Sequence, residues 1–397
     1  MRLPLEGIRV LDLSSIIAAP VAATTLGDFG AEIVKVEDPG HGDFMRRGAA
    51  KPGGRSLQWV QDARNKSSIT LDLRKKEARD IVHRLLPHFD VLVTNFRPPT
   101  LRKWGFDPDT IRSSYPRLVA LYVTGYGLTG PYADRGAFDR AASAFSGLTY
   151  VSGDADRPPV RTGYAVIDYM GAYAGAFGVI TALYNRDHRG GSGQVIDLAL
   201  YEPGFRASED AMLVYSATGK VRERVGNTNP KVVPANDYDT ADGKRVSIHA
   251  GTETLLRRLA KVIGRPGLAE EPPFRDYRSR VENQDALYAI IADWAGKTTL
   301  ADAMAALVAA DIPASPLMSV ADIAADPHFR ERGTLIEVED EEYGRLSMAA
   351  PIPRMSETPG QVRSLGLALG SGNEAVLGGM LGMSGTEIEA LRKAGVI

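Results

Sequence analysis

The chain has 397 residues, with 47 lysines and arginines against 49 aspartates and glutamates, and a formal net charge of −2. This length predicts two domains. The balanced charge argues against nucleic acid or a membrane as a partner held by bulk charge. The absence of cysteine excludes disulfides, thiolate catalysis and cysteine-ligated metals. Residues 1–13 carry charges where a signal peptide needs an apolar run, so we expect a cytoplasmic protein.

Residues 1–200 alternate between strand-like and helix-like patterns. Short β-branched or aliphatic runs predict strands at residues 8–13, 32–36, 68–73, 91–94 and 118–123. Helical patterns lie between several of them, at residues 18–29, 75–88 and 107–114. Such alternation predicts an α/β fold, with a Rossmann-like, mostly parallel sheet and helices on both of its faces.

The loop after the first predicted strand lacks the glycines of a dinucleotide-binding turn. Residues 14–20 read Ser-Ser-Ile-Ile-Ala-Ala-Pro instead of Gly-x-Gly-x-x-Gly. The chain also lacks the Gly-x-x-x-x-Gly-Lys-Ser/Thr of nucleoside triphosphatases. A Rossmann-type dinucleotide cofactor and phosphoryl transfer from ATP are therefore not supported.

Beyond the large domain of residues 1–200 we expect three further parts. Residues 201–226 are a polar-interrupted helical linker. A smaller α+β domain follows at 227–325, with Asp242-Gly243 as a hairpin turn and helical patterns at 253–263, 284–294 and 300–309. The C-terminal segment 326–397 contains a strand pair at 333–338 and 344–348 and a final amphipathic helix at 384–393.

The most informative feature is an apolar, glycine-rich helix pattern that Asp168 opens and that runs to Arg186. A carboxylate there is either an ordinary N-cap or an oriented nucleophile that the helix dipole keeps ionised near neutral pH. The stretch from Tyr164 to Tyr184 is long enough to cross a membrane. Its Asp168 and its abundant Gly and Ala favour a packed internal helix.

Six motifs, in the same order along the chain, resemble those of class III CoA-transferases. They lie at residues 4–13, 26–37, 65–73, 95–98 (Asn-Phe-Arg-Pro), 125–132 and 168–200, the last containing Gly-Gln-Val-Ile-Asp at residues 193–197. That family includes formyl-CoA transferase, carnitine CoA-transferase relatives and α-methylacyl-CoA racemases. The resemblance implies that Asp168 becomes acylated. It also implies that segment 326–397 returns to the large domain, and that two chains form an interlocked-ring homodimer.

The resemblance also implies a site for polyanionic coenzyme A, which is a substrate; no tightly bound cofactor is expected. Residues expected along the pantetheine and phosphates are Arg74, Asn95, Phe96, Arg97 and Lys103, with Ile17 and Ala18 near the thiol and Phe138 beside them. Arg97 and Lys103 are expected to share the start of a helix, where anions bind well. Asp38 stands where relatives carry an adenosine-side arginine, which puts the adenine contacts in doubt.

The pair Phe138-Asp139 separates the two chemistries of the family. Racemases carry His-Asp there, and that histidine is one of two bases on opposite faces of the α-carbon. Phe138 cannot move a proton, so transfer is favoured and Asp139 becomes a structural residue, such as a helix cap. The alternatives that remain are a 2-methylacyl-CoA racemase or epimerase and a non-catalytic CoA-binding protein.

Substrates and further ligands are less well defined by the sequence. Formyl-CoA transferases cover the aspartate with a glycine-repeat loop, whereas the matching segment here offers only Gly226-Asn227 as a gating turn. This difference argues against formyl-CoA and oxalate. Many relatives use succinyl-CoA and small dicarboxylic acids. The six histidines show no metal-binding spacing, so no metal is expected.

Overall fold

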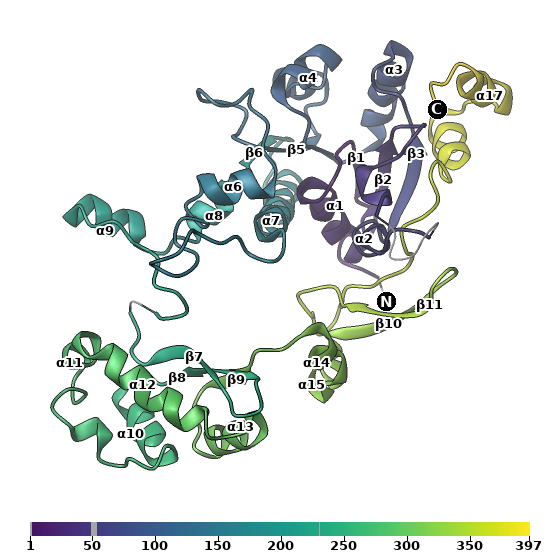
Figure 1. Cartoon of the computed structure of the whole chain (residues 1–397). Helices are drawn as coiled ribbons and strands as arrows, with labels where there is room; N and C mark the ends of the chain where they lie inside the picture. The colour runs from purple at the N-terminus through teal and green to yellow at the C-terminus, as the bar shows by residue number, and fades with distance from the viewer. Residues whose placement is uncertain (1, 49–53, 230) are drawn as a thin grey trace. The chain divides into compact units, whose positions relative to one another are not determined.

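The computed structural model describes residues 2–48, 54–229 and 231–397. The chain divides into two compact units (Figure 1). Unit 1 contains Met1–Leu148, Arg161–Met212 and Arg330–Ile397, and unit 2 contains Thr149–Val160 and Leu213–Phe329. The predicted domain boundaries stay predictions.

Unit 1 is built on a parallel sheet, which confirms the predicted α/β class. Its six strands lie in the order β3-β2-β1-β4-β5-β6. All neighbouring strands run parallel. The strands are β1 (Arg9–Asp12), β2 (Glu32–Glu37), β3 (Lys66–Thr70), β4 (Val91–Thr94), β5 (Val119–Thr124) and β6 (Val195–Ala199).

Side chains that alternate along the strands build two separate cores, one on each face of the sheet. Val10 faces the core formed with α1 (Ala18–Asp28) and α7 (Val166–His188). Leu11 faces the core formed with α3 (Lys76–Leu85), among other elements. The other helices of unit 1 are α2 (Leu57–Asp62), α4 (Pro98–Trp104), α5 (Pro108–Ser114), α6 (Asp139–Phe145) and α8 (Glu202–Arg206), with 3-10 turns at Phe44–Arg46 and Leu86–His88.

Helix α7 lies against α1 and β5 because its inward positions are small. A Cβ atom at Gly171 would come 3.1 Å from Leu200, and one at Gly175 would come 2.9 Å from Leu121. By length and composition α7 alone, among the described helices, could cross a membrane, yet half of its most apolar window is buried within the protein. This matches the expected packed internal helix.

Two elements of unit 1 have other boundaries than the sequence predicted. The third strand begins at Lys66 rather than at residue 68 and ends at Thr70, and Leu71 and Leu73 after it pack in the same core as Leu11. The helix expected at residues 75–88 is α3 followed by a separate 3-10 turn. Pro87 lies inside that turn and has no N–H to continue the α-helical ladder.

Unit 2 is a three-stranded antiparallel sheet with helices, the predicted α+β arrangement. Its strands are β7 (Ala235–Asp239), β8 (Arg245–His249) and β9 (Ala314–Pro316). Gly243 has a φ of 72° in the turn between β7 and β8, as the Asp-Gly pair predicted. The helices are α10 (Glu253–Val262), α11 (Tyr277–Glu282), α12 (Gln284–Ala295), α13 (Leu300–Ala309) and α14 (Val320–Ala325), with a 3-10 turn at Leu268–Glu270.

The helical pattern expected from Tyr201 onwards is divided in the structure. Helix α8 ends at Arg206, and α9 (Ala211–Thr218) stops before Gly219, whose φ of 72° suits a helix end. Residues 219–224 are not helical.

The C-terminal residues from Arg330 onwards belong to unit 1. Strands β10 (Leu335–Asp340) and β11 (Gly344–Ala349) form the predicted antiparallel pair. Asn373 then hydrogen-bonds both the backbone and the side chain of Thr70 on the edge strand β3. The remaining helices are α15 (Pro327–Glu331), the π-helical turn Glu374–Gly378, α16 (Gly379–Leu381) and α17 (Gly385–Lys393). These hydrogen bonds join the C-terminal residues to the sheet of unit 1, and the predicted bounds of the segment stay a prediction.

Gly193, in the turn before β6, predicts a steep cost for an added methyl group. A Cβ atom there would lie 2.2 Å from the carbonyl oxygen of Leu118, a backbone atom that cannot swing away. Gly193→Ala should lower the free energy of unfolding by about 1–3 kcal/mol in urea titrations followed by circular dichroism. Gly379→Ala is the matched control, because that helical glycine has no neighbour within 4 Å. Equal stability of the two variants would contradict the prediction.

Candidate active site

A cavity of about 670 Å³ opens at the carboxyl ends of the parallel strands. The loop after β1 leads to α1 on one face of the sheet, and the loop after β4 leads to α4, whose Leu101 packs on the other face. Neighbouring loops that diverge in this way open a crevice. The lining residues are Ser15, Ile16, Ile17, Ala18, Asn95, Phe96, Arg97, Thr100, Trp104, Val123, Thr124, Gly125, Gly136, Ala137, Phe138, Asp168 and Leu200.

Asp168 lies in the first turn of α7, but it is not the N-cap. The helix begins at Val166, and its N-cap Ala165 has no capping side chain. Asp139 caps α7 instead, because its Oδ1 accepts the N–H groups of Ile167 at 3.0 Å and Asp168 at 3.4 Å. The predicted capping role of Asp139 is thus confirmed, although it caps α7 rather than its own helix α6. The carboxylate of Asp168 therefore does not cap the helix.

The environment of Asp168 does not favour its ionised form as the helix start had led us to expect. Only 7% of the residue is exposed. Burial, and then the nearby negative charge of Asp139, raise the pKa of Asp168 to about 7. We expected the helix dipole to keep Asp168 fully ionised near neutral pH. That expectation was wrong, because the cost of removing the charge from water outweighs the stabilisation by the dipole. Near neutral pH both the protonated and the ionised forms of this carboxyl group are therefore populated.

The loop between β1 and α1 forms one wall of the cavity in an uncommon backbone conformation. Ile16 has a φ of 72°, which is rare for a β-branched residue. Its N–H donates to the Asp43 carboxylate at 3.2 Å. The side chain of Asn95 holds Ser15 on both sides, accepting its N–H at 3.0 Å and donating to its carbonyl at 2.7 Å. The loop is therefore fixed from β4 and from the segment after β2.

Beneath this loop lies a cluster of buried charges. Lys35 pairs with Asp43 at 2.9 Å, and Lys66 pairs with Asp12 at 2.9 Å. Lys35 also donates to the carbonyl of Ser14 at 2.8 Å. Although burial opposes ionisation, the two lysines hold the pKa of Asp12 at about 2. The cluster ties the loop to the sheet.

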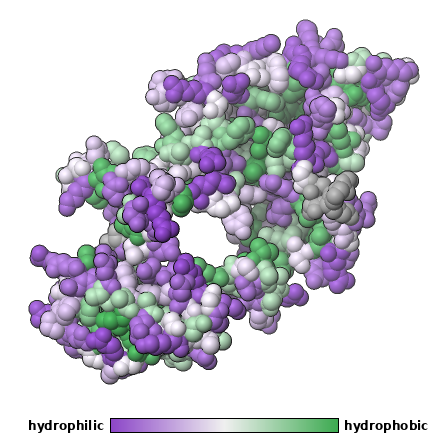
Figure 2. Space-filling model, in the orientation of Figure 1, coloured by the Kyte–Doolittle hydropathy of each residue, from purple (hydrophilic) through white to green (hydrophobic). Residues whose placement is uncertain are grey.

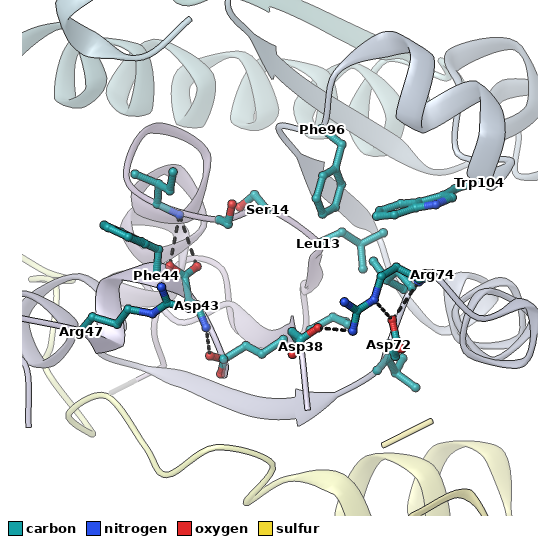
Figure 3. A pocket seen from close by; sticks show the side chains of 17 residues that line it. Leu13, Ser14, Asp38, Asp43, Phe44, Arg47, Asp72, Arg74, Phe96 and Trp104 are labelled. Carbon is teal, nitrogen blue, oxygen red and sulfur yellow. Dashed lines mark hydrogen bonds and ion pairs between the residues drawn. The ribbon is translucent and has the colours of Figure 1, made fainter. Parts of the chain in front are cut away.

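A second cavity of about 360 Å³ shares Ser15, Ile16, Phe96 and Trp104 with the first. In Figure 3 the rings of Phe96 and Trp104 stand above Leu13, and Arg74 lies between Asp38 and Asp72. The two rings meet edge to face with centroids 4.9 Å apart. The shared residues make the two cavities neighbours along one wall.

Arg74, expected to bind an anion, is already paired with carboxylates. Its Nη2 lies 2.9 Å from Asp38 and its Nε lies 2.6 Å from Asp72. Asp38 thus partly neutralises the cation that was expected to bind an anion. Arg47 and Arg97 also line these cavities, and neither forms an ion pair with any described residue.

Most of the predicted site residues lie together. Seven line the larger cavity, namely Ile17, Ala18, Asn95, Phe96, Arg97, Phe138 and Asp168, and Arg74 lines the smaller one. Lys103 was wrongly placed at a helix start, because α4 begins at Pro98 and Lys103 lies exposed in its last turn, outside both cavities. Gly226 and Asn227 belong to unit 2, and their gating role stays a prediction. Within the described ranges, no three His, Asp or Glu side chains form a group able to hold a metal.

Sequence reasoning missed several residues of the site. Arg47, Trp104 and Thr124 carry no local pattern that marks them. Gly125 was noted only as part of a motif, and the structure gives it a reason: a Cβ atom there would lie 2.8 Å from the backbone nitrogen of Ala137. This close approach brings the segment with Ala137 and Phe138 against the end of β5.

Comparison with known proteins places the chain in a family. The pattern of CoA-transferase family III matches residues 5–371. The succinyl-CoA–L-malate CoA-transferase β subunit of Chloroflexus aurantiacus is 43% identical over 399 residues, covering 100% of this chain and 98% of that protein. The succinyl-CoA–D-citramalate CoA-transferase of the same organism is 39% identical, covering 99% of this chain and 98% of its own length.

A solved structure agrees with these relatives. A CAIB/BAIF family protein from Brucella suis is 31% identical and superposes with a TM-score of 0.83, covering 96% of this chain and 100% of that one. The chain therefore belongs to CoA-transferase family III, as its motifs predicted. It is an enzyme of the class that moves coenzyme A between acyl groups.

The charge of Asp139 predicts a shift in the pH profile. Activity that depends on ionised Asp168 should rise with pH through about 7. Asp139→Asn keeps an oxygen that can accept the α7 N–H groups but removes the negative charge, so the pKa of Asp168 should fall. The acidic limb of kcat/KM against pH should then move to lower pH.

The control is Asp197→Asn, which removes a carboxylate outside the cavity, one that accepts the N–H of Leu128. Its limb should stay where the unmodified protein has it. An unmoved limb in Asp139→Asn would show that the two carboxylates are not electrostatically coupled.

Proposed function

We propose that Asp168 is the covalent nucleophile of this CoA-transferase, with succinyl-CoA as donor and a small dicarboxylic acid as acceptor. The observation that carries the proposal is the state of Asp168. It is the only carboxylate among the described residues that line the larger cavity, it is buried, and its pKa is raised to about 7. An oriented carboxylate that loses its proton near neutral pH is suited to attack a thioester.

The proposed reaction proceeds through two anhydrides and one thioester. An oxygen of Asp168 attacks the thioester carbonyl carbon, the C–S bond breaks, and CoA leaves as a thiolate. The thiolate attacks the aspartyl carbonyl of this mixed anhydride, so the donor acid leaves as a carboxylate and Asp168 carries CoA. The acceptor carboxylate then attacks the aspartyl carbonyl and expels the thiolate. The thiolate attacks the acceptor's carbonyl, which restores Asp168 and releases the new acyl-CoA.

The two neighbouring cavities support a path for the CoA chain. The thiol end reaches Asp168 past Ile17 and Ala18, and the pantetheine lies along Phe96 and Asn95. Because the Asn95 amide is engaged with Ser15, its contribution is to shape the wall rather than to bind directly. The phosphates are drawn towards Arg47, Arg74 and Arg97; Lys103 contributes charge at longer range.

The choice of substrates rests on the relatives. Two that match nearly the whole chain are a succinyl-CoA–L-malate and a succinyl-CoA–D-citramalate CoA-transferase. A succinate–glutarate CoA-transferase from Agrobacterium fabrum is 31% identical over 90% of the chain. Their acids share two carboxylates on a short carbon chain. Such an acid, with succinyl-CoA, is the proposed pair here.

Racemisation is disfavoured by Phe138. This residue is 68% exposed and lines the cavity, where its ring can neither take nor give a proton. An α-proton exchange reaction needs a base on each face of the substrate carbon. Asp139, the other member of the pair, is occupied with the N-terminus of α7.

We also propose that the protein is a homodimer and that it works in the cytoplasm. Large apolar side chains remain exposed along α7, among them Tyr173, Phe177, Ile180 and Tyr184. In Figure 2 hydrophobic residues gather in the part of unit 1 that α6, α7 and α8 occupy in Figure 1. Exposed apolar groups on this scale favour an interface. Sedimentation of the purified chain tests whether it pairs with itself.

Replacing Asp168 predicts loss of activity with retention of the fold. The carboxylate accepts no hydrogen bond from a described side chain, and its burial opposes its charge. Asp168→Ala should therefore abolish exchange of CoA between succinyl-CoA and L-malate without lowering the thermal midpoint. Mass spectrometry of the acyl-CoA products measures the exchange. A folded variant that retains more than a few per cent of activity would remove Asp168 from the reaction.

Trapping predicts where CoA becomes attached. With succinyl-CoA but no acceptor acid, hydroxylamine should convert Asp168 into its hydroxamate, because a thioester carbonyl reacts with nitrogen nucleophiles and a free carboxylate does not. Peptide mass measurement should place the change between Thr162 and Arg186. Labelling of another carboxylate would move the active site. Turnover with no donor-dependent labelling would instead indicate direct transfer between the two substrates.

A further inference from the structure

Thr124 carries a hydroxyl group that the folded protein leaves unused. It is the last residue of β5 and is 4% exposed. Its Oγ1 has less than 1 Å² of accessible surface and no hydrogen-bond partner. Its carbonyl is satisfied, because it accepts the N–H of Leu200 at 2.8 Å. The same residue lines the cavity of Asp168.

A buried hydroxyl without a partner is costly. Leaving such a group unsatisfied forfeits its hydrogen bond to water, whereas valine has nearly the same shape and no polar atom. Buried threonines elsewhere in unit 1 do find partners. Thr94, at the end of neighbouring β4, accepts the N–H of Phe96, and Thr24 donates to the carbonyl of Pro20 at 3.0 Å. Thr124 differs from these threonines, and it stands where the end of β5 forms part of the cavity wall.

We propose that the Thr124 hydroxyl donates a hydrogen bond to the oxygen of the reacting carbonyl when substrate lies beside Asp168. The proposal rests on Asp168 as nucleophile. Attack on a thioester or an anhydride drives negative charge onto the carbonyl oxygen, and donors aimed at that oxygen lower the barrier. In this proposal a rotation about χ1 brings Oγ1 to the cavity side when substrate is bound. Oγ1 has no hydrogen bond within the described residues that this rotation would break.

Two polar side chains of the cavity wall, Asn95 and Arg97, are less suited to this position than Thr124. The side-chain amide of Asn95 already accepts the N–H of Ser15 and donates to the carbonyl of Ser15. Arg97, the single cation among the described lining residues, is exposed at the cavity wall and extends along Gly136, with its Cδ 3.6 Å from the place of a Cβ there. Asp168 takes no hydrogen bond from Thr124 that would hold the hydroxyl in the ground state. The donor is thus free for the transition state.

The test compares three substitutions at this position. Thr124→Val removes the hydroxyl but keeps the shape, so kcat should fall about 100-fold with little change in KM. The thermal midpoint should rise or stay unchanged, because an unsatisfied group is lost. Thr124→Ser restores the hydroxyl and should regain most of kcat. Thr124→Ala serves as a second hydroxyl-free variant, and its kcat should also be low.

Ser143 provides the matched control. Its Oγ is also buried without a partner, but the residue lies in α6 and lines neither cavity. Ser143→Ala should keep the activity of the unmodified protein. Together with Thr124→Val, it separates the general effect of removing an unsatisfied hydroxyl from a role in the reaction. Unchanged kcat in a folded Thr124→Val protein would overturn the proposal.

The rate of hydroxylamine labelling distinguishes this proposal from the one on which it rests. Donor-dependent labelling of Asp168 in the unmodified protein that slows in Thr124→Val supports both. Labelling at the same rate in both proteins rejects the role of Thr124 and leaves Asp168 as nucleophile. Turnover without labelling of Asp168 in the unmodified protein rejects the nucleophile itself.

Discussion

The site depends on the buried charge cluster of Asp12, Lys35, Asp43 and Lys66 below the loop between β1 and α1. A buried ion pair adds little net stability, but removing one partner leaves an uncompensated charge and is strongly destabilising. Here the cluster is tied directly to the backbone, since Lys35 holds the carbonyl of Ser14 and Asp43 holds the N–H of Ile16. It therefore fixes a strained loop that forms one wall of the reaction cavity.

Small residues set the opposite wall. Glycines at 171 and 175 let α7 approach Leu200 and Leu121 closely, and this places the first turn of the helix at the carboxyl end of the sheet. Asp139 then satisfies the free N–H groups of that turn from a different helix. The carboxylate of Asp168 therefore does not cap the helix, and burial together with the same neighbour raises its pKa to about 7. Asp139 thus has two effects: it caps α7 and it raises the pKa of Asp168.

The cavity contains two groups that are unfavourable in a folded protein. They are the buried carboxyl group of Asp168, whose pKa is raised to about 7, and the unsatisfied hydroxyl group of Thr124. Neither gains a partner within the described residues, and each destabilises the fold slightly. Such local conflicts are expected at functional sites, where the surrounding structure tolerates groups that serve a ligand. The apolar cores on both faces of the sheet, anchored by residues such as Val10 and Leu11, supply the stability that allows it.

The sequence by itself determined the alternating strands and helices, the parallel sheet and the family, because periodicity and ordered motifs are local properties of the chain. It also singled out Asp168, whose role in the reaction is proposed above. The family resemblance also indicated seven of the seventeen residues that line the larger cavity. Only the tertiary structure decided that Asp139 rather than Asp168 caps α7, that Arg74 is held by Asp38 and Asp72, and that Lys103 lies outside the cavities. These outcomes depend on which distant groups share a desolvated space. Burial and long-range pairing set the pKa of a carboxyl group and the availability of a cation, and neither can be read from neighbours in sequence.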